Sequence, residues 1–311
     1  MSAAGELIAT RTRAGYAVLA AAVAASVSLG ASLAAAASDP WLDRVRRFEP
    51  GTSAGFGAGE LPRIVLGRPQ GAGALQGSLD VVSLGNAGII EVRFADNAVM
   101  DGPGDDLAIY ENAFHAGDEN GPIFTEFALI EVSRDGKTWR AFPYDAQSGE
   151  GLAGRQPVYA NSSNAIDPLA AEGGGDRFDI GEVGLDYVTA VRITDAGSLI
   201  DDVGNHSYAG TKGGFDLDAA AALNSTALAR LYGVVTVAGS PAADIRVRVR
   251  AVAEQRWQRR KTRADGSYQL RRLLPQGDYV VRAGPRGEAW QETHVFLGLE
   301  QMLVEADFAL P

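Results

Sequence analysis

The chain of 311 residues contains no cysteine and only three histidines, which are His115, His206 and His294. Without cysteine the protein can form no disulfide bonds, no thiolate metal sites and no cysteine nucleophile. Three scattered histidines also argue against a multi-histidine zinc site. Stability and any metal binding must therefore come from packed cores and oxygen ligands.

Basic residues are also in deficit, with 28 lysines and arginines against 39 aspartates and glutamates and a net charge of −11. This balance argues against nucleic-acid binding, which depends on cations that face phosphates. The deficit is local: residues 38–229 carry 13 basic and 29 acidic side chains, a net of −16, whereas residues 230–311 carry 13 and 9, a net of +4. The hydrophobic content of 46% is ample for packed cores and rules out general disorder.

The first 37 residues have the pattern of a secretory signal peptide. Arg11 and Arg13 precede an uncharged stretch, residues 14–37, which closes on four consecutive alanines. A basic start, an apolar middle and a small-residue end predict export to the cell surface, the periplasm or the extracellular space. The alternative is an uncleaved membrane anchor, because the stretch has about the ~20 residues that a span requires.

Helical periodicity is scarce in the rest of the chain, and short β-rich runs separated by turn residues dominate. The two helical candidates are residues 41–48 and, less favoured because it opens like a strand end, 218–229. The expected strands of the first domain are 63–66, 79–84, 89–94, 107–111, 127–133, 139–143 and 190–194. This pattern predicts an all-β protein of two β-sandwich domains: a larger jelly-roll-like or Greek-key sandwich over 38–226, and a small seven-stranded sandwich over 230–311.

Two local patterns are specific enough to predict side-chain directions. In residues 89–94, Ile90, Val92 and Phe94 alternate with charged residues and should point into a core. In residues 245–251 the apolar residues should likewise point inward and the arginines outward.

Asp135-Gly136 lies between two β-rich runs and predicts a hairpin.

The second domain resembles the carboxypeptidase regulatory-like domain, a transthyretin-like β-sandwich. The matching residues are Gly233-Val234-Val235, Gly239-Ser240-Pro241, Asp265-Gly266-Ser267-Tyr268 and Gly277-Asp278-Tyr279-Val280. The resemblance covers nearly all of residues 230–311 and implies an accessory module without catalytic residues.

The first domain resembles a family of bacterial exported proteins described as cell surface proteins, over residues 45–222. The most distinctive matching segment is Asp101-Gly102-Pro103-Gly104-Asp105-Asp106-Leu107-Ala108-Ile109-Tyr110-Glu111-Asn112, and a second is Gly213-Gly214-Phe215-Asp216-Leu217-Asp218-Ala219. The resemblance implies a location outside the cytoplasm and a sandwich fold, and it implies no reaction.

Carboxylates in these two segments predict a calcium site. Four fall within eleven residues around a Gly-Pro-Gly turn, and two more are spaced to share one face of a strand. The predicted ligands are Asp101, Asp105, Asp106, Glu111, Asp216 and Asp218. Calcium takes six to eight oxygen ligands, which such a group can supply. The alternative is that these are turn-forming, solvated carboxylates.

The sequence thus favours a non-catalytic surface or secreted binding protein, stabilised by calcium, whose ligand is a carbohydrate or another surface polymer. The alternative is an extracellular hydrolase that acts on a polymer through carboxylates such as Glu111 with Glu126 or Glu131. The long loop region 147–181 is either a binding region or a mobile excursion without a function. A basic strip, residues 256–263, is either a solvated hairpin face or a docking surface for an anionic polymer or for the acidic first domain.

Overall fold

The computed structural model describes residues 38–197, 213–285, 287, 289–298 and 303–311. The predicted signal peptide, residues 1–37, lies outside the described residues. Within the described residues, no helix is long and apolar enough to span a membrane. The helical segments there are short 3-10 turns, and almost all regular structure is β.

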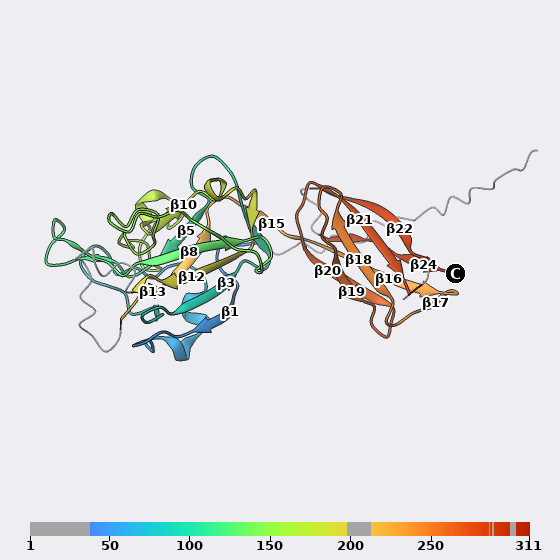
Figure 1. Ribbon diagram of the computed structural model, residues 1–311, viewed down its shortest axis with the longest axis horizontal. Helices are drawn as coiled ribbons and strands as arrows, with labels where there is room; N and C mark the ends of the chain where they lie inside the picture. The colour runs from blue at the N-terminus through green and yellow to red at the C-terminus, as the bar shows by residue number, and fades with distance from the viewer. Residues whose placement is uncertain (1–37, 198–212, 286, 288, 299–302) are drawn as a thin grey trace, which may run out of the picture.

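A five-stranded antiparallel sheet forms one layer of the first domain (Figure 1). Its strand order is β1 (Arg44–Glu49), β3 (Ile89–Arg93), β12 (Ala190–Asp195), β8 (Ala128–Ser133) and β9 (Arg140–Ala141). As the alternation predicts, Ile90, Val92 and Phe94 are fully buried. The Asp135-Gly136 hairpin is also confirmed, because β8 and β9 pair across that turn.

Shorter antiparallel sheets pack on the inner side of this layer. They are β10 (Asp176–Phe178) with β5 (Leu107–Tyr110) and β14 (Ala219–Ala222); β11 (Tyr187–Val188) with β4 (Asn97–Met100) and β15 (Ser225–Ala227); and β13 (Asp216–Leu217) with β2 (Val82–Ser83). A small ribbon of β6 (Phe114–His115) and β7 (Ile123–Phe124) extends from the domain. Inner side chains of β3, β8 and β12 join those of β5 and β14 in one hydrophobic core.

Three local predictions are wrong. Residues 41–48 contain β1 instead of a helix, residues 63–66 form the 3-10 turn Arg63–Val65 instead of a strand, and 218–229 is divided between strands. The register of β1 against β3 shifts between Val45 and Arg47. This irregularity breaks the strict alternation that identifies a strand in a sequence.

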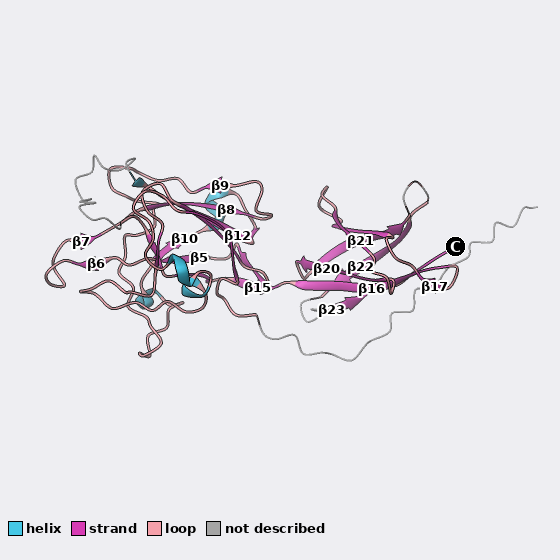
Figure 2. Cartoon of the chain, turned by 90° about the horizontal axis from the view of Figure 1, so that it is seen from below, coloured by secondary structure: helices cyan, strands magenta, loops and turns pink. Residues whose placement is uncertain are grey.

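The second domain is a sandwich of two sheets (Figure 2). One contains β17 (Ser240–Pro241), β16 (Ala229–Val237) and β20 (Ser267–Leu273), with β23 (Leu303–Glu305) and β24 (Phe308–Leu310) parallel to β16. The other has the order β19 (Gln258–Lys261), β18 (Arg246–Ala251), β21 (Gly277–Gly284) and β22 (Gln291–Leu297). The predicted all-β architecture of two β-sandwich domains is therefore confirmed, but the second sandwich has nine strands among the described residues instead of the predicted seven.

Two buried tyrosines hold the core of the second domain in register. Tyr268 donates its hydroxyl hydrogen to the carbonyl of Ala306, and Tyr279 donates to the carbonyl of Leu274 at 3.0 Å. Each ring therefore fills the core while its hydroxyl group stays bonded. This core is separate from that of the first domain, and only Leu228 lies between β15 and β16.

Candidate functional site

Three carboxylates of the first domain come together where β4, β5 and a 3-10 turn meet. Asp101 follows β4, Asp106 precedes β5, and Asp179 precedes the turn Ile180–Val183. One carboxylate oxygen from each lies within 4.8 Å of the others, so this group can hold a metal ion. We call it the three-aspartate cluster.

Backbone donors fix the shape of the three-aspartate cluster. Asp106 Oδ1 accepts hydrogen bonds from the backbone N–H of Gly102 at 2.9 Å and from Asn224 Nδ2 at 2.7 Å. Asp179 Oδ1 accepts from the N–H of Gly181 at 2.8 Å. A Cβ at Gly181 would lie 2.9 Å from Asp101 Oδ1, so glycine there allows the approach. All donor atoms are oxygens, which suits a hard cation such as calcium or magnesium.

The six predicted ligands do not form one site. Asp101 and Asp106 join the three-aspartate cluster, but Asp105 does not, and its carbonyl accepts from Asn224. Asp218 lies elsewhere and accepts from the backbone N–H of Gln70 at 2.9 and 3.1 Å. The sequence prediction missed Asp179, whose only local signal is its position two residues before Gly181.

Glu111 and Asp216 belong to a second group at the ends of several strands, which we call the buried acidic cluster. Its members are Glu111, Asn112, Glu126, Asp195 and Asp216. Glu111 Oε1 accepts from the N–H of Asp216 at 3.4 Å, and Asp216 Oδ2 accepts from Asn112 Nδ2 at 3.4 Å. Glu126 and Asp195 accept from backbone N–H groups of the same segment, Gly214 and Phe215, at 2.9 and 2.7 Å.

Burial and mutual repulsion make these carboxyl groups weak acids. Burial, reinforced by the charges of Asp216 and Glu126, raises the pKa of Glu111 well above its usual value. Burial and the charge of Asp216 raise the pKa of Glu126 to about 8. Burial also raises the pKa of Asp216, while the neighbouring polar side chains of Ser83 and Asn112 favour its charged form.

The carboxylate pairs considered for a hydrolase do not face solvent. Glu111 is 3% exposed and Glu126 is 8% exposed, so a polymer has no direct access to either. Glu131 lies on the outer face of the five-stranded sheet, where Arg192 Nη1 donates to it at 3.1 Å. A glycosidase requires two accessible carboxyl groups on either side of a substrate bond, and Glu111 and Glu126 are buried in this structure.

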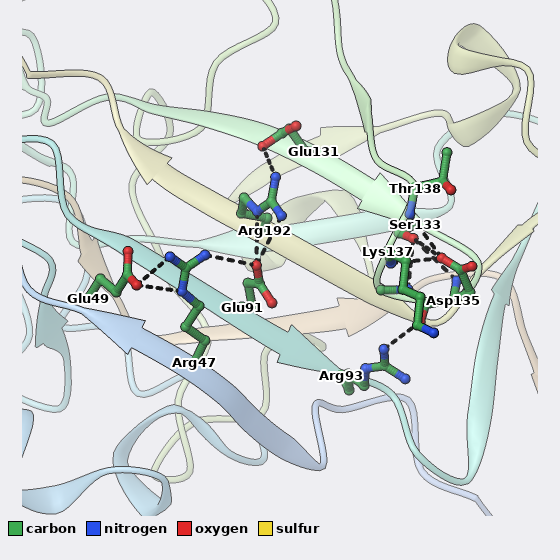
Figure 3. A network of polar contacts seen from close by, with 11 residues as sticks. Arg47, Glu49, Glu91, Arg93, Glu131, Ser133, Asp135, Lys137, Thr138 and Arg192 are labelled. Atoms are coloured by element: carbon green, nitrogen blue, oxygen red, sulfur yellow. Dashed lines mark hydrogen bonds and ion pairs between the residues drawn. The ribbon is translucent and has the colours of Figure 1, made fainter.

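The outer face of the five-stranded sheet balances its charges between neighbouring strands (Figure 3). Arg47 lies opposite Glu91, Glu91 opposite Arg192, and Arg192 opposite Glu131. The Arg192 guanidinium donates to both glutamates and stacks over the ring of Trp139, 4.1 Å from its centroid. Opposite charges in adjacent strands stabilise a sheet, so this face needs no partner.

The outer face of the second domain, formed by β19, β18 and β21, has the contrary pattern. Arg248 lies opposite Arg259 on one side and opposite Arg282 on the other, and Arg246 lies opposite Lys261. We call these five residues the basic face. Burial, followed by the charges of Arg259, Arg282 and Arg246, lowers the pKa of Arg248. Two carboxylates pair at its margins, Asp244 with Lys261 and Glu292 with Arg282.

Two tryptophans order the basic face. The Arg248 guanidinium lies 3.8 Å from the ring centroid of Trp290, while Arg250 and Arg282 each lie 5.1 Å from that of Trp257. Such stacking fixes the guanidinium planes. Beside them is a hollow of about 640 Å³, lined by Arg246, Val247, Arg248, Arg259, Arg260 and Lys261.

Comparison with protein-family models and with curated proteins finds no match for the chain. The resemblances of its two domains to exported cell surface proteins and to carboxypeptidase regulatory-like domains therefore stay predictions.

Solved structures with some similarity exist. The group B streptococcus pilus 2b backbone protein is 9% identical, with a TM-score of 0.25, over 73% of this chain and 93% of the other. The Bacillus anthracis TIE protein is 10% identical, with a TM-score of 0.24, over 71% and 42%. The dioxygenase domain of a dioxygenase carbohydrate-binding protein fusion from Streptomyces sp. SirexAA-E is 15% identical, with a TM-score of 0.22, over 27% and 80%. At these values the chain is similar to proteins of several kinds, and none of them assigns it a function.

Proposed function

We propose that this protein is an exported, non-catalytic binding protein of the cell surface or its surroundings, and that its ligand is an anionic polysaccharide. The basic face carries this proposal. Export rests on the signal-peptide pattern of residues 1–37. The second domain is then the ligand-binding module, and the acidic first domain is its calcium-stabilised companion.

The physical argument is the row of like charges on the basic face. Arg259, Arg248 and Arg282 lie side by side on three neighbouring strands, and like charges in that position destabilise a sheet. The first domain alternates its charges in the equivalent position and so avoids the penalty. A polyanion that lies across the strands would neutralise the row and relieve the repulsion.

The shape and chemistry of the face favour a polymer with spaced carboxylate groups. Guanidinium groups bind carboxylates through paired N–H donors, and stacking on tryptophan holds them in position before the ligand arrives. Trp257 and Trp290 also offer rings of the kind that pack against sugars.

Binding of polygalacturonate to the full chain tests this proposal, with neutral dextran and single-stranded DNA as comparison polymers. We expect polygalacturonate to bind with an affinity that falls as salt is added, and R248Q/R259Q/K261Q to lose about tenfold or more of that affinity. The control R63Q/R140Q, which removes two exposed cations of the first domain, should bind normally.

Equal binding by R248Q/R259Q/K261Q and the native chain would overturn the role of the basic face. Binding of DNA as tight as that of polygalacturonate would overturn the assignment to polysaccharides.

For the first domain we propose that the three-aspartate cluster binds calcium and stabilises the sandwich. The ion would join the chain after β4 to the chain before β5 and to the turn at Asp179. At a calcium concentration of about 100 times the Kd, binding adds about 2.7 kcal/mol to the free energy of unfolding.

Thermal melts in calcium and in EDTA test the stabilisation. For a domain of this size we expect calcium to raise the Tm of the native chain by roughly 5–10 °C. D101N/D179N should lose the part of that increase that the three-aspartate cluster supplies. Equal Tm values in calcium and EDTA would exclude the proposal.

A further inference from the structure

We propose that the buried acidic cluster is a second cation site, in which Glu111, Asn112 and Asp216 provide the oxygen ligands for a calcium ion. The site is distinct from the three-aspartate cluster and does not depend on the polymer-binding proposal. Its donors come from the end of β5 and the start of β13, two segments that lie about a hundred residues apart in the chain.

Three buried oxygens without partners point to the ion. Glu111 Oε2, Asn112 Oδ1 and Asp216 Oδ1 are all shielded from solvent, and none has a hydrogen-bond partner among the described residues. The second polar atom of each side chain is bonded within the cluster: Glu111 Oε1 accepts from Asp216, and Asn112 Nδ2 donates to Asp216 Oδ2. A buried oxygen without a partner destabilises the fold, and a charged one does so more strongly.

Among the described residues, the charged groups around the site are carboxyl groups. The charged groups that act on Glu111 are Asp216 and Glu126, and the charged group that acts on Asp216 is Asp195. In the described part of the chain, none of the charged groups that shift the pKa of Glu111 or Asp216 is a lysine or an arginine. Several carboxylates in one buried place repel one another strongly, and a divalent cation offsets both the repulsion and the missing hydrogen bonds.

Two glycines next to the site leave room for the side chains of the buried acidic cluster. Gly77 lies against the Asn112 amide, and a Cβ at Gly77 would be 2.6 Å from Asn112 Oδ1. Gly214 lies against Asp195 in the same way, with a Cβ position 2.9 Å from Asp195 Oδ2. Backbone N–H groups hold Glu126 Oε1 and both carboxylate oxygens of Asp195 beside the site.

Calcium titration of the metal-free full chain by calorimetry tests the second site. We expect two binding sites in the native chain, and one in each of the variants D101N/D179N and E111Q/D216N. N112A, which removes only the amide oxygen, should weaken the second site about tenfold. N112A also keeps the test valid if E111Q/D216N does not fold. D145N/E150Q, which neutralises two exposed carboxylates, is the matched control and should keep both sites.

The variants separate this inference from the calcium proposal for the three-aspartate cluster. If D101N/D179N abolishes all binding, the second site does not exist. If E111Q/D216N and N112A bind calcium as the native chain does, the inference is also overturned. If E111Q/D216N abolishes all binding while D101N/D179N changes nothing, the second site stands and the three-aspartate cluster is not a calcium site.

Discussion

At the scale of single residues, Asp176 shows how burial and hydrogen bonding compete. Its Oδ2 accepts from the backbone N–H groups of Gly154 at 2.7 Å and Arg155 at 2.9 Å. These bonds favour the charged form, but the side chain is only 6% exposed. Burial is the stronger effect and raises its pKa from 3.8 to about 6.

This shift predicts a pH dependence of stability. Because the folded chain holds the Asp176 proton more tightly than the unfolded chain, the group loses stabilising effect as pH rises from about 4 to about 6. We expect D176N to remove this contribution. Between pH 4 and pH 7, the free energy of unfolding of the native chain should fall relative to that of D176N by up to about 3 kcal/mol.

Urea denaturation at a series of pH values measures this difference. D145N is the control, because the backbone N–H groups of Ser148 and Gln147 lower the pKa of the exposed Asp145. Its removal should change the slope in the opposite direction. If D176N and the native chain keep parallel pH profiles, Asp176 titrates normally.

At the scale of the strands, Arg192 links three elements of the five-stranded sheet. Its guanidinium bonds to Glu91 on β3 and Glu131 on β8 and stacks on Trp139. We expect R192Q to lower the free energy of unfolding by about 1–3 kcal/mol, since it removes the cation from Glu131 and leaves Glu91 with Arg47 alone. Chemical denaturation measures the loss.

A double-mutant cycle tests the cause. In an E91Q/E131Q background the same R192Q change should cost less than half as much, because the carboxylates are gone. R140Q, on the exposed edge strand β9, should cost less than about 0.5 kcal/mol. An R192Q loss that is the same in both backgrounds would assign the effect to Trp139 packing alone.

The strands also show what a sequence can and cannot predict. Ile90, Val92 and Phe94 were predictable because strict alternation reports one buried face. β1 was not, because its arginines also fit one face of a helix and its pairing shifts at Val45. The candidate sites were predictable only in part. Asp106 and Glu111 can be recognised in their sequence motif. Asp179 lies beside Asp106, and Glu126 lies near Glu111, only because the fold brings distant segments together, and no local sequence pattern predicts this.

At the scale of the whole molecule, few polar contacts join the two domains. Arg272 Nη2 donates to the carbonyl of Phe94 at 2.7 Å, and Arg256 forms an ion pair with Asp135. Part of the predicted basic strip thus contacts the acidic first domain. Burial, followed by the charges of Arg93, Arg44 and Arg46, lowers the pKa of Arg272 to about 10.

We therefore expect R256A/R272A to loosen the junction without unfolding either core. The radius of gyration from small-angle scattering should rise, and the chain near Leu228 should be cleaved faster by protease, while the Tm changes little. R271A, an exposed neighbour on β20, should leave both readings unchanged. Unchanged scattering and cleavage in R256A/R272A would mean that other contacts hold the domains together.

The parallel pairing of β24 with β16 has a mechanical consequence. β16 enters the second domain from the first, and β24 runs beside it in the same direction to residue 310. A pull between the first domain and the end of β24 draws these two strands past each other lengthwise. The pull then loads all of the hydrogen bonds between β16 and β24 at the same time, so these bonds do not break one after another. The second domain would therefore resist a pull that is applied along the chain.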